Sequence, residues 1–158
     1  MSHRTYQDIL SLVMQPSRYI GGETNAVRKD FNTAKLKIAL VFPDLYEIGM
    51  SHFGLQIIYS LLNRQEDILV ERVFAPGSDM ENQLRKNKIP LKSIESKQPL
   101  SKFDVVGFSL LYELTYTNML NILELSGIPF RADKRDESHP LIIAGGPCTC
   151  NPEPVARF

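Results

Sequence analysis

Apolar runs alternate with amphipathic stretches along this chain, and this alternation constrains the fold more than any other feature. The apolar runs predict β-strands over 36–42, 68–74, 91–94, 104–110 and 141–144. The amphipathic stretches predict helices over 6–14, 51–63, 79–88 and 115–126. This order is typical of a parallel sheet with helices on both faces and right-handed crossovers. The sequence therefore predicts a three-layer α/β/α fold with a mostly parallel sheet.

The apolar content of each run predicts its place in the sheet. Runs 36–42 and 104–110 are the most continuous, as buried parallel strands are, so we expect them to be central neighbours. Run 91–94 is half polar, which suits an edge strand. The expected order is 91–94, 68–74, 36–42, 104–110, 141–144. Crossovers then leave 36–42 in opposite directions, and α/β sheets bind ligands at such a switch point, outside the carboxyl ends of the strands.

The helices and the N-terminal part carry further expectations. Ser78 is predicted to cap helix 79–88. Residues 15–34 are polar and contain Gly21-Gly22, so we expect an N-terminal helix and arm over 1–34 and an α/β domain over 35–158. A one-turn helix start at the chain end indicates a longer parent protein. Helix 51–63 is expected to bury its apolar residues Phe53, Ile57, Ile58, Leu61 and Leu62.

Composition excludes several classes of protein. The chain has 158 residues, of which 43% are hydrophobic and 23% charged, as in a folded globular domain. Its 18 basic residues balance its 18 acidic ones, so charge predicts no binding to nucleic acid or to a membrane surface. No apolar run is long enough to span a bilayer, and the N-terminus has no signal-peptide core. The two cysteines lie one residue apart, and a reducing cytoplasmic location is expected.

Three loops are predicted to meet at the switch point and to form a pocket: 43–49, 109–116 and 145–147. The candidate binding residues on these loops are Asp44, Tyr46, Gly49, Ser109, Leu111, Gly145 and Gly146. Each also has a purely structural interpretation. Asp44 can cap a turn, Gly49 can supply a positive φ angle, and Ser109 can satisfy a backbone group. The glycine pair 145–146 can turn the chain or allow a ligand to approach closely.

The pattern Asp44-x-Tyr46-x-x-Gly49, then Ser109-x-Leu111, then Gly145-Gly146 resembles the motif series of cobalamin-binding domains. Longer phrases point the same way: Arg18-Tyr19-Ile20-Gly21-Gly22-Glu23, Phe42-Pro43-Asp44-Leu45-Tyr46-Glu47-Ile48-Gly49-Met50-Ser51-His52 and Ala144-Gly145-Gly146-Pro147-Cys148. They resemble the N-terminal region of a family of uncharacterised radical S-adenosylmethionine (SAM) proteins with a vitamin-B12-binding-like domain.

This resemblance implies a flavodoxin-like fold, a cobalamin (vitamin B12) module over 35–158, and a downstream radical SAM domain as its partner. That domain would hold SAM and a [4Fe-4S] cluster and carry out methyl transfer or related radical chemistry. The cluster signature Cys-x-x-x-Cys-x-x-Cys is not in this chain, and Cys148-Thr149-Cys150 has another spacing. We therefore expect no metal site, no catalytic residue and no reaction from this chain alone.

Tyr46 departs from the cobalamin-binding pattern, in which a histidine at this position ligates cobalt. A phenol has a pKa of about 10 and is a poor ligand at neutral pH, so cobalamin here would lack that ligand. The alternative is that the domain has lost cobalamin and serves as a scaffold that docks against the catalytic domain. A deep slot beside Ser109 and Gly145 would favour cobalamin. A slot filled by Tyr46, Met50 or Leu111 would favour the scaffold.

Overall fold

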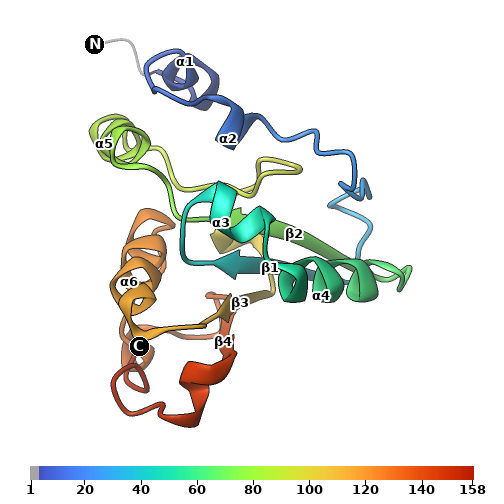
Figure 1. Ribbon diagram of the computed structural model, residues 1–158, viewed down its shortest axis with the longest axis vertical. Helices are drawn as coiled ribbons and strands as arrows, with labels where there is room; N and C mark the ends of the chain where they lie inside the picture. The colour runs from blue at the N-terminus through green and yellow to red at the C-terminus, as the bar shows by residue number, and fades with distance from the viewer. Residues whose placement is uncertain (1–3) are drawn as a thin grey trace.

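The computed structural model describes residues 4–158 and has one parallel four-stranded sheet (Figure 1). Its strands are β1 Leu36–Phe42, β2 Ile68–Phe74, β3 Val105–Ser109 and β4 Leu141–Gly145. They lie in the order β2-β1-β3-β4, and all three pairings are parallel. The predicted flavodoxin-like α/β fold and the predicted order of these strands are confirmed. The first three residues of the expected N-terminal segment lie outside the described part.

Helices lie on both faces of the sheet and give the predicted three layers (Figure 1). The α-helices are α1 Tyr6–Leu10, α2 Ser17–Ile20, α3 Tyr46–Met50, α4 Phe53–Asn63, α5 Ser78–Asn87 and α6 Tyr116–Leu125. Short 3-10 helices are η1 Leu100–Lys102, η2 Glu113–Thr115, η3 Ala132–Lys134 and η4 Pro147–Cys150. Within residues 4–158, no helix has the length and hydropathy needed to cross a membrane.

The central strand β1 feeds two cores because its side chains alternate between the faces of the sheet. Ala39 and Val41 point into the core on the side of α1, α5 and α6, called here the α6-side core. Leu40 and Phe42 point into the core on the other side, called here the α4-side core. The buried members of the α4-side core are Leu40, Phe42, Leu55, Tyr59, Val70, Phe74 and Ile94. Burial on both faces explains why β1 reads as a continuous apolar run.

The prediction of a fifth strand over 91–94 is wrong, because side chains already occupy the outer edge of β2. The amide of Asn63 donates to the carbonyl of Val70 (3.0 Å) and accepts from its N–H (3.1 Å). The Glu95 carboxylate accepts from the N–H of Arg72 at 2.8 Å. The bond from Ile94 N–H to the Arg72 carbonyl (3.0 Å) resembles a strand contact with β2, and Lys92 forms an isolated antiparallel bridge with Pro99 instead of pairing with β2. Residues 91–94 therefore cover the edge of β2 without continuing the sheet.

Several helix predictions need correction. The helix predicted over 6–14 ends at Leu10, and the helix predicted from Ser51 begins at Phe53. The loop predicted over 43–49 contains a short helix, α3. Ser78 is the first helical residue of α5, and its N-cap is Gly77, with no side-chain capping bond.

The buried face of α4 also differs from the prediction. Phe53, Ile57, Ile58 and Leu61 are exposed, and Leu62 is half-buried. Apolar residues surround most of this helix, but the sheet can cover only one stripe of it. That stripe is Leu55, Tyr59 and Asn63, spaced by four residues. Much of the apolar surface of α4 therefore remains uncovered.

Candidate functional site

The strand order brings the predicted candidate residues to one edge of the sheet. Ser109, the last residue of β3, pairs in register with Gly145, the last residue of β4. Asp44 lies two residues after the end of β1, in the loop that leads to α3. Leu111 follows β3 and packs against the α4-side core. The carboxyl ends of β1, β3 and β4 therefore bring these residues to the same edge of the sheet.

Asp44 ties the loop after β3 to the end of β1. Its Oδ2 accepts a hydrogen bond from the hydroxyl of Tyr112, and its Oδ1 accepts one from the N–H of Leu45 at 2.7 Å. The hydrogen bond to Asp44 raises the pKa of Tyr112 above its usual range. Asn118 adds a second tie, because its Nδ2 donates to the Pro43 carbonyl at 2.9 Å. Both carboxylate oxygens of Asp44 thus have partners within the domain.

Tyr46 points into the domain and not toward the Ser109–Gly145 pair. Its hydroxyl donates to Oε1 of Glu23 at 3.1 Å, and its ring meets that of Phe74 edge-on at 5.5 Å. Burial, followed by the nearby Glu23 carboxylate, raises the pKa of Tyr46. A phenol held in this way is a hydrogen-bond donor, which makes it a still poorer cobalt ligand at neutral pH.

Gly49 is required by close packing. It is not among the positive-φ residues of the chain, so a positive φ angle is not its role. A Cβ atom at Gly49 would lie 2.3 Å from Cε1 of Phe74 and 3.2 Å from Cδ1 of Phe42. Only glycine allows α3 to approach the α4-side core so closely.

The two glycines after β4 have different roles. Gly146 has a φ of 109°, and a Cβ atom there would lie 2.5 Å from the Leu110 carbonyl oxygen, so this position turns the chain. A Cβ atom at Gly145 would have nothing within 4 Å. The N–H of Leu110 donates to the Gly145 carbonyl at 2.7 Å and fixes both loops at this edge. Gly145 therefore leaves open space beside Ser109.

The region behind this edge is filled by side chains. Tyr46, Met50 and Leu111 pack against the α4-side core. Four cavities formed by residues 4–158 have volumes of about 360, 530, 380 and 390 Å³, and none of these four is lined by Ser109, Gly145 or Gly146. None of these four cavities is therefore a slot beside Ser109 and Gly145.

A buried ionic cluster that the sequence analysis missed lies at the edge of β2. Arg72 has no exposed side-chain surface, and its Nε donates to Oε1 of Glu95 at 2.8 Å. Its Nη1 donates to Gln56 (2.9 Å) and Asn25 (3.1 Å), and the guanidinium stacks on the ring of Tyr59 at 4.3 Å. The signal in the sequence was a Glu-Arg pair inside an apolar strand, where unpaired charges are rare.

Burial dominates the electrostatics of this cluster. Desolvation raises the pKa of Glu95 to about 7, although Arg72 opposes the shift. Glu23 reaches the cluster from the N-terminal arm, with its Oε2 3.9 Å from Nη2 of Arg72. Neither of these two buried atoms has a hydrogen-bond partner in the described part of the chain.

Gly21 explains how the arm reaches this cluster. It has a φ of 73°, and a Cβ atom there would lie 2.1 Å from the Ile94 carbonyl oxygen. The glycine therefore lets the arm cross the 94–96 segment at close range and deliver Glu23 to Arg72. The segment from Arg18 to Glu23 thus has a structural role in bringing Glu23 to Arg72, and this role is separate from the strand-end loops.

The comparison with protein families gives one match, which covers more than half of the chain. The model for the N-terminal region of radical SAM proteins matches residues 54–158. The chain belongs to this family. Radical SAM proteins use SAM and an iron–sulfur cluster, and membership implies a downstream radical SAM domain in the parent protein. No curated protein and no solved structure matches the chain significantly.

The two cysteines of this radical SAM N-terminal domain lie close together in the sequence but differ in exposure. Cys148 is buried and Cys150 is exposed, and both are free thiols in η4. Among residues 4–158, no group of three or more His, Cys, Asp or Glu side chains is placed to hold a metal ion. A [4Fe-4S] cluster usually needs cysteine ligands at a compatible spacing, which this arrangement does not provide.

Proposed function

We propose that this domain supports and docks against the radical SAM catalytic domain of its parent protein. The observation that carries the proposal is an apolar surface on α4 and β4, called here the α4–β4 surface. Its members are Phe53, Ile57, Ile58, Leu61, Leu141 and Ile143, each between 45% and 84% exposed. Apolar patches of this kind on a folded domain mark interaction sites.

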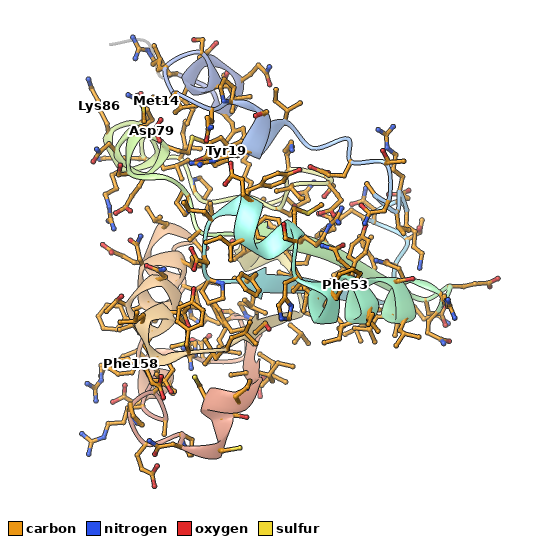
Figure 2. All side chains as sticks on the ribbon, in the orientation of Figure 1. Met14, Tyr19, Phe53, Asp79, Lys86 and Phe158 are labelled. Atoms are coloured by element: carbon orange, nitrogen blue, oxygen red, sulfur yellow. The ribbon has the colours of Figure 1, made fainter. Side chains whose placement is uncertain are left out.

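The members of the α4–β4 surface lie on the same side of the sheet. Phe53 lies at the start of α4 (Figure 2). Ile57 and Leu61 follow it at four-residue spacing, away from the buried stripe of this helix. On β4, Ile143 lies near Gly107, whose neighbours Val106 and Phe108 point into the α6-side core on the opposite face. Leu141 alternates with Ile142 and shares the face of Ile143.

The arrangement of the helices leaves this part of the sheet open. Helix α4 packs on β2 and β1, and β4 has little cover on the α4 side (Figure 1). A second domain packed there would bury the α4 row and the β4 face together. The radical SAM domain is the occupant that family membership supplies.

Hydrogen exchange tests this proposal. The 158-residue chain is compared with the parent protein that includes the radical SAM domain. Amides of α4 and β4 should exchange more slowly in the parent, because docking removes the openings that expose them, while those of α1 and α5 should be unchanged. Equal exchange of α4 and β4 in the two proteins would refute docking at this surface.

A matched pair of variants sharpens the test. Phe53 is 84% exposed on α4, and Met14 is 87% exposed beside α5, away from α4 (Figure 2). Each is changed to Lys. Both variants should leave the stability of the isolated chain within about 0.5 kcal/mol, since both side chains are exposed. In the parent, Phe53→Lys should remove the added protection, and Met14→Lys should retain it.

Cobalamin binding is the second candidate function, favoured by the Ser109–Gly145 pair. Ser109 shares the α4 side of β3 with Gly107, and Gly145 has room for an approaching group. In this role, Ser109 would hydrogen-bond the nucleotide tail of the corrinoid, which would enter beside Gly145. Tyr46 is held by Glu23 and would not ligate cobalt. Cobalamin would supply a methyl-carrying cobalt to the catalytic domain.

Absorbance titration with hydroxocobalamin separates the two functions. The cobalamin function predicts saturable binding that Gly145→Val abolishes, because a branched side chain fills the open space. Tyr46→Phe should change the affinity little, because no cobalt–oxygen bond is lost. The absence of binding by both the isolated chain and the parent protein would refute the cobalamin function and leave the docking function untouched.

A further inference from the structure

Glu71 is a buried residue whose carboxylate has one oxygen that no protein donor in the described part of the chain uses. It lies in the middle of β2 and is 1% exposed. Its Oε2 accepts from the hydroxyl (2.7 Å) and the N–H (3.3 Å) of Ser96. Within residues 4–158, its Oε1 has no hydrogen-bond partner, and no basic side chain lies within ion-pair distance of the carboxylate. This oxygen keeps accessible surface where Glu71 lines the cavity described next, so an N–H donor that enters the cavity can reach it.

Glu71 lines a cavity of about 530 Å³ between the N-terminal arm and the edge of β2. The other walls include Gly22, Val27, Glu95 and Ser96. The volume is within the range of about 300–1,000 Å³ typical of small-molecule sites. Gly22 has a φ of 93°, and a Cβ atom there would have nothing within 4 Å, so the arm borders open space at this residue.

The charges around the inner wall favour a cation. Glu95 pairs with Arg72, so this carboxylate and guanidinium offset each other. Lys97 interacts electrostatically with Glu23, Glu95 and Glu71, but its ammonium group donates its hydrogen bond to the Ile94 carbonyl at 2.6 Å. Among these groups, Glu71 keeps an acceptor that no cation of the described chain uses.

The basic residues of the outer wall do not serve Glu71. The ammonium group of Lys29 donates to the carbonyls of Gln65 and Ile68, both at 2.6 Å. Ile68 begins β2, about 10 Å along the strand from Glu71 at roughly 3.3 Å per residue. Arg28 is exposed and also lines the cavity, and no ion pair between it and Glu71 is found within residues 4–158. The inner wall is therefore acidic where the cavity meets Glu71.

We infer that this cavity binds a small organic cation with N–H donors, a primary ammonium or a guanidinium, with Glu71 as its counter-ion. The donor takes the free Oε1 of Glu71, while Ser96 holds Oε2 and fixes the carboxylate. The arm from Gly21 to Val27 closes the site from outside. This site is separate from the α4–β4 surface and does not depend on the docking function.

Nuclear magnetic resonance of the 158-residue chain tests the inference. Butylammonium chloride is titrated into the labelled chain and the Ser96 and Gly22 amides are followed, with tetramethylammonium chloride as a control of equal charge that has no N–H donor. Butylammonium should give saturable shifts with a Kd in the millimolar range. Equal shifts with tetramethylammonium, or no saturable shift with butylammonium, would overturn the proposal. Saturation by inorganic phosphate in its place would assign the cavity to anions and would also overturn it.

Three variants assign the effect to Glu71. Glu71→Gln keeps the shape and removes the charge, and it should weaken butylammonium binding by about tenfold or more. Glu66→Gln makes the same change at an exposed position and should bind butylammonium as tightly as the unsubstituted 158-residue chain does. Ser96→Ala keeps the charge of Glu71 but removes the hydroxyl that fixes the carboxylate, so it should weaken butylammonium binding less than Glu71→Gln does, and it covers the case in which Glu71→Gln does not fold. An unchanged butylammonium affinity in a folded Glu71→Gln or in a folded Ser96→Ala would refute the roles assigned to these two side chains.

Discussion

Replacing Gly49 with Ala should destabilise the domain by an amount that the packing of α3 sets. The new methyl group would lie 2.3 Å and 2.4 Å from two ring carbons of Phe74, and 3.2 Å from Phe42. Phe74 is 6% exposed and Phe42 is 1% exposed, so neither ring can move into solvent without loss of core packing. Overpacking of this kind costs about 1–3 kcal/mol. For a domain of this size, each kcal/mol lowers Tm by about 2–4 °C.

Urea unfolding and thermal melting measure the effect, and Gly145→Ala is the matched control. Gly145 is also one of the candidate binding residues, but a Cβ atom there would have nothing within 4 Å and its φ angle is not positive. The control should be neutral or stabilise by about 0.4–1 kcal/mol through the unfolded chain. If Gly49→Ala were as stable as Gly145→Ala, the packing role assigned to Gly49 would be wrong.

Further predictions concern hydrogen bonds, pH and iron. Tyr46→Phe should lower the free energy of unfolding by about 1–3 kcal/mol, because Glu23 loses its donor in a buried setting; the exposed Tyr112→Phe should cost less in the same urea assay. The pKa of Glu95 rises from 4.5 to about 7 on folding, so its contribution to stability is present below pH 4.5 and is lost as the pH rises toward 7. Unfolding measured across this window should show the decline, and Glu95→Gln should flatten it; an identical pH profile in both proteins would contradict the assignment. Anaerobic iron–sulfur reconstitution should leave the chain colourless, and a stable brown product with about four irons per chain would contradict the assessment of Cys148 and Cys150.

The parallel sheet could be predicted because its strands are largely apolar runs. Burial on both faces leaves that mark most clearly in the sequence of 36–42, whereas 68–74 also contains the Glu71-Arg72 pair. The failure at 91–94 has a side-chain cause, since Asn63 and Glu95 occupy the edge that a fifth strand would need. The sequence around Asn63 and around Glu95 does not indicate that either side chain hydrogen-bonds to the backbone of β2. The short helix α3 was missed because five residues that include a glycine carry no helical periodicity.

The candidate site was predictable in its place but not in its contacts. The strand order put Ser109 and Gly145 at one edge, and they are paired there. The partner of Tyr46 is Glu23 on the arm, and the partner of Asp44 is Tyr112 on the loop after β3. These pairs depend on how distant segments pack, which residue types and spacing within one segment do not encode. The buried face of α4 could not be predicted for the same reason, because the neighbouring elements determine which of its apolar stripes is covered.

The two edges of the sheet differ in a way that limits how copies of this domain could assemble. On β2, side chains and the 94–96 segment already satisfy the outward backbone groups of Val70 and Arg72. On β4, exposed residues leave the outer edge accessible within the described chain. Joining two copies through β4 around a twofold axis uses the accessible edge of each, and no further edge remains for a third. Edge-to-edge association would therefore stop at a closed pair, whereas a fibre requires two accessible edges per molecule.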